Sequence, residues 1–523
     1  MRKHRNKLFL FVLITLFTLF IAGCAQEPEN STTNNNSGND GGQAGGELII
    51  SVLSDATQLD PHKGTDIPSA NVYYGKIFEG LVSQDENMEI QPSLAESWEQ
   101  LDELTWEFKL RKGVQFHDGA DFNAEAVKKN FERILDPETA SPRSNLFEMI
   151  VEMNVIDEHT IQFVTEYPFT PLLSNLAHYS GGIISPKAID EYGQELGQQP
   201  VGTGIFAFDS WIPGQEIRLM KNENYWGDPA KVDSVVFQVI PEDSTRISLV
   251  ETGDSHIAEP VPITEIERVQ NSSTMSLFRS PALGVDYIGF NVTKEPFDDP
   301  RVRQAINYAI DTEVILSGVY NNVGTLAKGP MGPGVWGYSE NIEGYGYDLD
   351  KAKELLKEAG IEDGFKTSIW TNDNKARIDV AEVVQSQLKG IGIDAEINVM
   401  EWGAYLEATA NGEHDMFILG WSNMTGDADY NQYFLYHSDA RGNPGNRSFY
   451  SNPNVDELIN KGRQESDPAK RLEIYEQAQQ IEIEDAPLVL LRNDEDLAAV
   501  GNNVKGFWMH PAGIYMLQDV TIN

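Results

Sequence analysis

Residues 378–399 read IDVAEVVQSQLKGIGIDAEINV, and this stretch predicts the class of fold. Its first part, residues 378–389, carries apolar side chains at helical spacing, and Gly390 follows as a helix breaker. Its second part, residues 393–399, alternates apolar and polar side chains, which is typical of a half-buried strand. A helix that leads through a glycine into a strand is typical of mixed α/β proteins.

The rest of the chain repeats this alternation of helix and strand signals. Asp299 and Pro300 predict the N-cap and first turn of a helix, and Gly360 predicts the end of another helix over residues 352–359. The apolar run at residues 47–53 predicts a buried strand. Because single cores stop growing at roughly 250–300 residues, a chain of this length should contain more than one α/β domain.

The N-terminus carries a targeting signal. A basic start precedes an uncharged, apolar run over residues 8–21, which is too short to span a bilayer comfortably but suits a secretory signal peptide. The run ends at Ile21-Ala22-Gly23-Cys24, which resembles a bacterial lipobox, and Cys24 is the only cysteine in the chain. We therefore expect residues 1–23 to be a lipoprotein signal peptide and Cys24 to carry the lipid. The alternative is a plain signal peptide followed by an incidental cysteine.

Residues 24–46 are predicted to be the lipidated cysteine and a flexible linker. The segment is rich in Asn, Gly, Ser and Thr and has no aromatic or large aliphatic residue, so it cannot bury enough apolar surface to fold. We expect it to tether an extracytoplasmic body to the outer face of the cell membrane, facing the periplasm if the cell has an outer membrane.

The charge balance excludes one class of partner. The chain has 39 basic and 81 acidic residues, a formal net charge of −42, and loss of the basic signal peptide makes the remainder more acidic still. Such a chain repels phosphate backbones, so we expect no nucleic-acid partner.

Several motifs in order resemble the extracellular solute-binding proteins of family 5, the peptide and nickel class of ABC importers. They are Leu59-Asp60-Pro61-His62, Leu94–Trp98 (LAESW), Trp106–Gly119 (WEFKLRKGVQFHDG), Val201–Gly204 (VGTG), Trp211–Gly214 (WIPG), Asn222–Trp226 (NENYW), Phe290-Asn291 and Pro296–Ala305 (PFDDPRVRQA). The resemblance covers nearly the whole chain after the linker and is nearest to the glutathione- and dipeptide-binding branch.

The resemblance implies an α/β, two-lobed fold like that of the periplasmic binding proteins (type II, large three-domain variety), with the ligand cleft between the lobes. A discontinuous domain I should comprise residues 47–70, 195–282 and 498–523. An inserted domain II should cover residues 71–194, and domain III, the opposing lobe, residues 283–497.

The resemblance also implies where the ligand lies. Trp402 and Trp421 match positions where relatives place aromatic walls, and a tryptophan grips varied ligands through its large flat surface. Both could instead be ordinary core residues. Asp66 and Asn71 match a stretch where relatives contact the ligand backbone, and Arg377 is a candidate carboxylate anchor or else an ordinary exposed arginine.

One position departs from the dipeptide pattern. Peptide binders of the family carry an aspartate three residues after the second tryptophan, where this chain has Met424, which cannot neutralise an ammonium group. Thr425 and Gly426 offer a hydroxyl and an approachable backbone amide for a ligand carboxylate. Asp427 or Asp429 could take the ammonium group, or they could cap the next helix or remain solvated.

The function implied is a substrate-binding lipoprotein that captures glutathione or a di- or oligopeptide and delivers it to ABC permease subunits, as a monomer. A binder of nickel chelates or oligosaccharides, or a signalling or adhesion lipoprotein that keeps the fold without transport, remains open. We expect no enzyme activity, cofactor or metal, because the nine histidines show no ligand spacing and no Gly-x-Ser-x-Gly motif occurs.

Overall fold

The computed structural model describes residues 45–442 and 445–523, and these described residues belong to one compact unit. The predicted signal peptide, Cys24 and nearly all of the predicted linker lie outside the described residues. Among the helices that the structure describes, none is long and apolar enough to cross a membrane.

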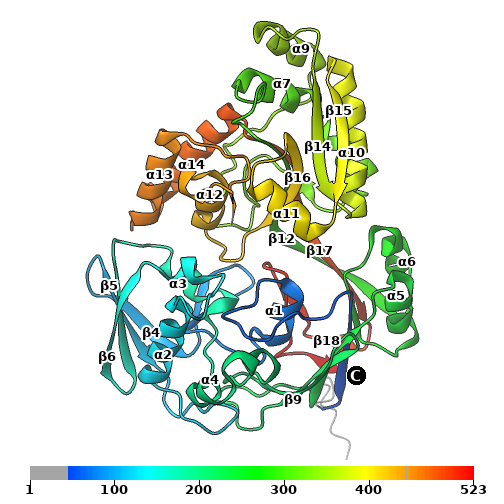
Figure 1. Ribbon diagram of the computed structural model, residues 1–523. Helices are drawn as coiled ribbons and strands as arrows, with labels where there is room; N and C mark the ends of the chain where they lie inside the picture. The colour runs from blue at the N-terminus through cyan, green and yellow to red at the C-terminus, as the bar shows by residue number, and fades with distance from the viewer. Residues whose placement is uncertain (1–44, 443–444) are drawn as a thin grey trace, which may run out of the picture. The chain divides into compact units, whose positions relative to one another are not determined.

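The largest sheet among the described residues has 11 strands (Figure 1). In sheet order the strands are β15 (Asp394–Met400), β14 (Lys366–Asn372), β16 (Met416–Ser422), β12 (Met275–Phe290), β17 (Leu488–Gly501), β11 (Ile257–Glu259), β1 (Glu47–Val52), β10 (Ser234–Val239), β9 (Glu216–Lys221) and β8 (Phe206–Ile212), and β13 (Thr325–Leu326) pairs with β17. The long strands β12 and β17 lie in the middle of this order and pair antiparallel, with a register shift between Pro281 and Val285. They therefore connect the half of the sheet that ends at β8 with the half that ends at β15.

The remaining strands form smaller antiparallel sheets. One has four strands in the order β4 (Ala95–Gln100), β5 (Thr105–Leu110), β7 (Thr160–Thr165) and β6 (Ile150–Asp157). The others are pairs: β2 (Val82–Gln84) with β3 (Ile90–Pro92), β18 (Val504–Lys505) with β21 (Thr521–Ile522), and β19 (Trp508–His510) with β20 (Ile514–Met516).

The α-helices of the described residues are α1 (Ile67–Tyr73), α2 (Ala124–Leu135), α3 (Leu172–Leu176), α4 (Pro186–Tyr192), α5 (Asp243–Thr252), α6 (Ile266–Gln270), α7 (Pro300–Ala309), α8 (Thr312–Gly318), α9 (Leu349–Glu358), α10 (Lys375–Leu388), α11 (Trp402–Ala410), α12 (Ala428–Tyr436), α13 (Pro453–Gln464) and α14 (Pro468–Asp485). The predicted helices near residues 300, 352 and 378 and the predicted strands near residues 47 and 393 are confirmed. Helix α10 begins three residues before the predicted start because Asn374 caps it, accepting a hydrogen bond from the Arg377 amide.

The half of the sheet that ends at β15 is covered on both faces. On one face Ile288 and Ile418 pack in a buried cluster with side chains of α7, α9 and α10. On the other face Tyr287 and Phe417 pack with side chains of α11, α12 and α13 (Figure 1). Strand β14 runs parallel to both β15 and β16, so the carboxyl ends of these strands meet at one edge. Helices α10, α11 and α12 all begin just after this edge, where an open α/β sheet binds ligands.

Candidate functional site

A cavity of about 370 Å³ lies against this sheet edge. Two groups of segments line it, which we call the first wall (residues 65–67, 142–146 and 179) and the second wall (residues 402, 420–424, 430 and 434). Five aromatic side chains surround the space: Tyr179, Trp402, Trp421, Tyr430 and Phe434. The charged residues of the lining are Asp66 and Arg143. This volume and this mixture of aromatic surface with a few polar groups suit a small ligand.

The two predicted tryptophans meet in the second wall. Trp402 is the first residue of α11, whose N-cap Glu401 accepts a hydrogen bond from the Ala404 amide at 3.1 Å, and its side chain is 41% exposed. Trp421 is the last residue but one of β16, and its ring centroid lies 5.5 Å from that of Tyr430. The indole Nε1 of Trp421 is buried without a hydrogen-bond partner among the described residues. It is therefore a free donor beside the cavity.

Asp66 is the acid of the first wall. It caps the short helix α1, accepting a hydrogen bond from the Ser69 amide at 2.9 Å and another from the Thr57 hydroxyl at 2.5 Å. These two bonds fix the carboxylate at the rim of the cavity and leave acceptor capacity for a ligand ammonium group.

Arg143, the cation of the first wall, was not predicted. Its guanidinium donates to the backbone oxygen of Thr65 at 3.2 Å and to the hydroxyl of Tyr179 at 2.9 Å. It also donates across the cavity to the hydroxyl of Tyr430 at 3.4 Å. Burial raises the pKa of Tyr179 to about 12, so this phenol stays neutral at physiological pH. No pattern in the sequence distinguishes Arg143 from an ordinary surface arginine.

Arg377 lies next to the second wall rather than in it. Its guanidinium carbon is 5.5 Å from the ring centroid of Trp402, and it donates to the side-chain oxygen of Asn372 at 3.0 Å. A β-carbon at Gly420 would lie 3.8 Å from Nη2 of Arg377. The same β-carbon would lie 2.7 Å from Oδ1 of Asp286, so a carboxylate as well as Arg377 lies behind Gly420.

Thr425 and Gly426 do not line this cavity, and their predicted role in binding a ligand carboxylate stays a prediction. The Gly426 amide donates to the side-chain oxygen of Asn423 at 2.7 Å, and the Thr425 hydroxyl lies 3.3 Å from the same oxygen. Both donors are therefore engaged within the turn. Met424, which precedes them, lines the cavity instead.

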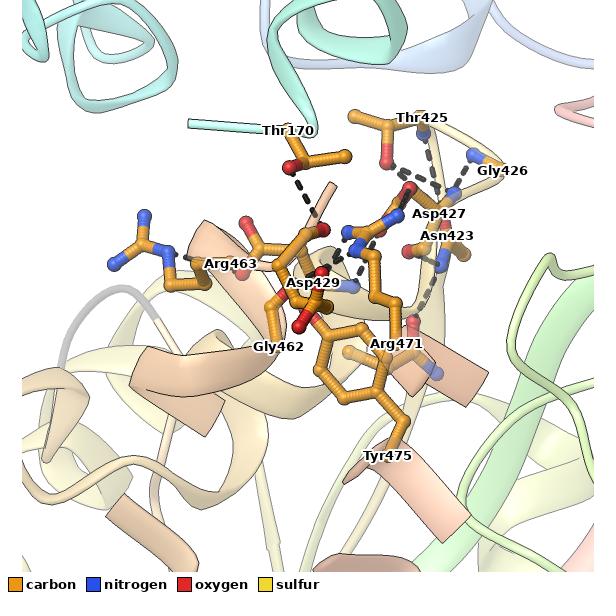
Figure 2. A network of polar contacts seen from close by, with 12 residues as sticks. Thr170, Asn423, Thr425, Gly426, Asp427, Asp429, Gly462, Arg463, Arg471 and Tyr475 are labelled. Atoms are coloured by element: carbon orange, nitrogen blue, oxygen red, sulfur yellow. Dashed lines mark hydrogen bonds and ion pairs between the residues drawn. The ribbon is translucent and has the colours of Figure 1, made fainter. Parts of the chain in front are cut away.

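Asp427 and Asp429 do not line this cavity either, and the role of one of them in binding an ammonium group stays a prediction. Figure 2 shows that each carboxylate faces an arginine from a later helix. Arg471 donates to both oxygens of Asp427 at 2.7 Å, and Arg463 lies 3.0 Å from Asp429. Asp427 also caps α12, as the alternative prediction held, by accepting from the Asp429 amide. Burial raises the pKa of Asp429, and the Arg463 charge opposes this shift.

Asn71 is buried in α1 away from the ligand cavity. Its side-chain oxygen accepts from the Tyr515 amide at 2.8 Å, and its Nδ2 donates to the Gly513 carbonyl at 3.2 Å. It lines a separate cavity of about 220 Å³ between α1 and the ends of β1 and β10. Its two hydrogen bonds attach α1 to the C-terminal hairpin, which is a structural role.

Two sets of polar contacts join segments near the first wall to segments near the second wall. Gln84 Nε2 donates to the Thr425 carbonyl at 2.7 Å. Thr170, drawn in Figure 2, donates from its amide to the Arg463 carbonyl and from its hydroxyl to the Glu465 carbonyl, both at 2.9 Å. The first contact holds the segment that follows Trp421, and the contacts of Thr170 hold the end of α13, against segments that precede α4.

Comparisons with known proteins identify the family to which the chain belongs. Residues 89–443 match the family described as bacterial extracellular solute-binding proteins, family 5 middle. The chain is 34% identical over 489 residues to the glutathione-binding protein GsiB of Escherichia coli strain K12, covering 92% of this chain and 95% of that protein.

Solved structures show the same fold. The periplasmic binding protein DppA of Helicobacter pylori in complex with the peptide STSA is 34% identical, with a TM-score of 0.81 and coverage of 92% of this chain and 98% of that one. A dipeptide binding protein of Pseudoalteromonas sp. SM9913 in complex with Met-Leu is 26% identical, with a TM-score of 0.82 and coverage of 91% and 100%. The predicted α/β fold of the periplasmic-binding-protein type is thus confirmed, and the chain belongs to family 5 of the bacterial extracellular solute-binding proteins.

Proposed function

We propose that this chain is the substrate-binding protein of an ABC importer, which captures a short peptide and delivers it to the permease in the membrane. Glutathione is the first candidate ligand. The observation that carries the proposal is the aromatic cavity whose charged lining residues are one carboxylate, Asp66, and one guanidinium, Arg143.

A free peptide has the complementary charges. Its ammonium group matches Asp66, its carboxylate matches Arg143, and its side chains can lie against the rings of Trp402 and Trp421. The names of relatives support this choice: glutathione for the Escherichia coli protein, STSA and Met-Leu for the two solved complexes. Peptide capture needs binding and release but no bond-making step.

The lipid anchor belongs to the same proposal. Cleavage before Cys24 and lipidation of its sulfur would tether the compact unit through residues 24–46 to the outer face of the membrane. There it would lie within reach of the permease subunits. Palmitate labelling of the wild-type chain and of Cys24→Ala tests this, since only the wild type should carry label.

The proposed domain division is the one that the resemblance implies: 47–70 with 195–282 and 498–523, then 71–194, then 283–497. The packing of the four-stranded sheet on α2 supports the second segment, because Phe108, Phe131 and Phe163 pack together there, and Tyr430, Phe434 and Ala440 of the proposed domain III join the same buried cluster. The register shift in β12 near Pro281 lies at a proposed boundary and is a candidate hinge. Small-angle scattering should show a smaller radius of gyration with saturating ligand than without it.

Calorimetric titration of residues 42–523, which contain the compact unit, tests the function directly. The titrants are reduced glutathione, oxidised glutathione, a mixture of di- and tripeptides, and a nickel–histidine chelate. Micromolar or tighter binding of glutathione or of the peptides supports the proposal. Binding of the chelate alone would instead indicate a metallophore receptor, and silence from every titrant would overturn the proposal.

A further inference from the structure

Arg143 differs from the other buried arginines in the groups that surround its positive charge. Among the buried arginines of the described residues, several form ion pairs: Arg133 with Asp60, Arg246 with Asp243, Arg463 with Asp429, Arg471 with Asp427, and Arg492 with Asp286. Arg303 and Arg447 lie in packed interior regions and donate to backbone carbonyls. Arg143 lines the ligand cavity and forms no ion pair with any Asp or Glu of residues 45–442 and 445–523.

The neighbours of Arg143 are neutral oxygens. A guanidinium has five N–H donors, and the described residues accept from Arg143 through Thr65, Tyr179 and Tyr430 only. Its Nε is buried without a partner. A desolvated cation without a counter-ion is unfavourable, and the chain carries 81 acidic residues from which a counter-ion could have been supplied. The missing negative charge is therefore best supplied by a ligand.

We infer that Arg143 is a specificity-determining residue that binds a carboxylate of the ligand from the first wall. On the opposite side a β-carbon at Gly420 would lie 2.7 Å from Oδ1 of Asp286 and 3.8 Å from Nη2 of Arg377, so an acid and a guanidinium both lie behind that wall and Arg143 is the guanidinium that lines the cavity. The ligand class is therefore a short peptide with a carboxylate for Arg143 and an ammonium group for Asp66, such as a γ-glutamyl tripeptide. This inference rests on the proposed function and narrows it.

Arg143 also contacts both walls of the cavity, so ligand binding to Arg143 should favour the arrangement in which the two walls are close together. Its Nη1 reaches Tyr430, which belongs to α12 and the second wall, whereas Thr65 and Tyr179 belong to the first wall. A carboxylate held by Arg143 therefore lies where the two walls meet. The guanidinium of Arg143 can donate to the bound ligand and to Tyr430 at the same time only when the two walls are close together.

The test is a set of titrations with reduced glutathione and two analogues that each lack one carboxylate: the glycine ethyl ester, and 4-aminobutyryl-cysteinyl-glycine. Arg143→Gln should weaken binding of glutathione by about tenfold or more, because a hydrogen bond to a charged group is lost. One of the two analogues should lose a similar factor on the wild type. The dissociation constants of that analogue for the wild type and for Arg143→Gln should then differ by less than about threefold, because the analogue lacks the carboxylate that Arg143 binds.

Arg301→Gln is the matched control, because it removes the same charge from an exposed arginine of α7 outside the cavity. It should leave glutathione binding unchanged. If Arg143→Gln does not fold, Arg143→Lys, which keeps the charge, replaces it in the titrations. The two analogues test the inference on the wild type alone, without any variant. Equal binding of glutathione by wild type and Arg143→Gln, or equal binding of glutathione and both analogues by wild type, overturns the inference alone. If the wild type binds no peptide at all, the proposed function falls with it.

Discussion

Arg471 donates two hydrogen bonds of 2.7 Å to the carboxylate of Asp427, and both side chains are almost wholly buried. The guanidinium also lies over the ring of Trp336 at 4.4 Å. The pair thus attaches α14 to the turn that follows Trp421, and that turn carries Met424 into the cavity wall. Asp427 therefore supports the cavity wall from behind and is not among the residues that line the cavity.

Asp427→Asn should therefore damage stability and not binding. Removing one partner of a buried ion pair leaves the other charge uncompensated, which destabilises a protein by about 3–5 kcal/mol. Urea unfolding should show this loss, whereas the folded fraction should bind glutathione within about twofold of the wild type. Asp439→Asn, at an exposed acid, is the control and should change stability by less than about 0.5 kcal/mol. Lost binding with unchanged stability would show that Asp427 recognises the ligand after all.

Trp402→Ala should have the opposite effect. The ring is 41% exposed and lines the cavity, so its loss removes contact surface from the ligand and little from the core. We expect glutathione affinity to fall about tenfold or more, the size typical of an aromatic anchor, with a shift in unfolding free energy below about 1 kcal/mol. Tyr347→Ala removes a comparably exposed aromatic ring outside the cavity and should leave affinity unchanged. A Trp402→Ala variant that binds normally would exclude this ring from the site.

Gln84→Ala tests the contacts that join the two walls. The substitution leaves the buried carbonyl of Thr425 without its donor at 2.7 Å, which costs about 1–3 kcal/mol in the joined arrangement. Ligand should then dissociate faster, by about fivefold or more in stopped-flow displacement. Gln91→Ala, on the same hairpin, breaks only a bond to Asp85 and should keep the wild-type rate. Equal rates in the two variants would mean that the Gln84 contact does not restrain release.

Whether a feature of the fold or of the site could be predicted from the sequence depends on how far apart in the chain its interacting residues lie. Helix α7 begins where Asp299 and Pro300 place it, and α9 ends before Gly360, which has a φ of +79°. Both signals act within one helical turn, so the sequence alone reveals them. The edge of the sheet that carries Trp402 and Trp421 could be located only through the resemblance to known proteins.

The charged part of the site could not be predicted, because its partners are distant in the chain. Arg471 lies 44 residues after Asp427, so no local pattern showed that the acid was already paired. Arg143 lies 287 residues before Tyr430, and only the folded chain brings them together. A sequence identifies which residues can carry charge, but the tertiary structure decides which of those charges remain free for a ligand.

Glu482 on α14 gives the fold a pH dependence that can be isolated. Burial raises the pKa of its carboxyl to about 8, against an ordinary value of 4.5, with Gln432 donating to it at 3.0 Å and Asp485 adding to the rise. Between these two values the folded chain holds a proton that the unfolded chain has released. Stability from this group is therefore complete below about pH 4.5 and is lost as pH rises toward 8.

Glu482→Gln replaces the carboxyl with a neutral group of the same shape, so the free energy of unfolding should no longer fall through this group as pH rises. Its unfolding free energy relative to the wild type should rise with pH between about 5 and 8, with a slope approaching about 1.4 kcal/mol per pH unit, and level off above pH 8. Asp496, whose pKa burial raises to about 7, titrates in both proteins and cancels in the difference. Urea unfolding of both chains at pH 5, 6, 7, 8 and 9 measures the slope. A difference that stays constant with pH would show that Glu482 is ionised in the folded chain, with solvent or a cation reaching it.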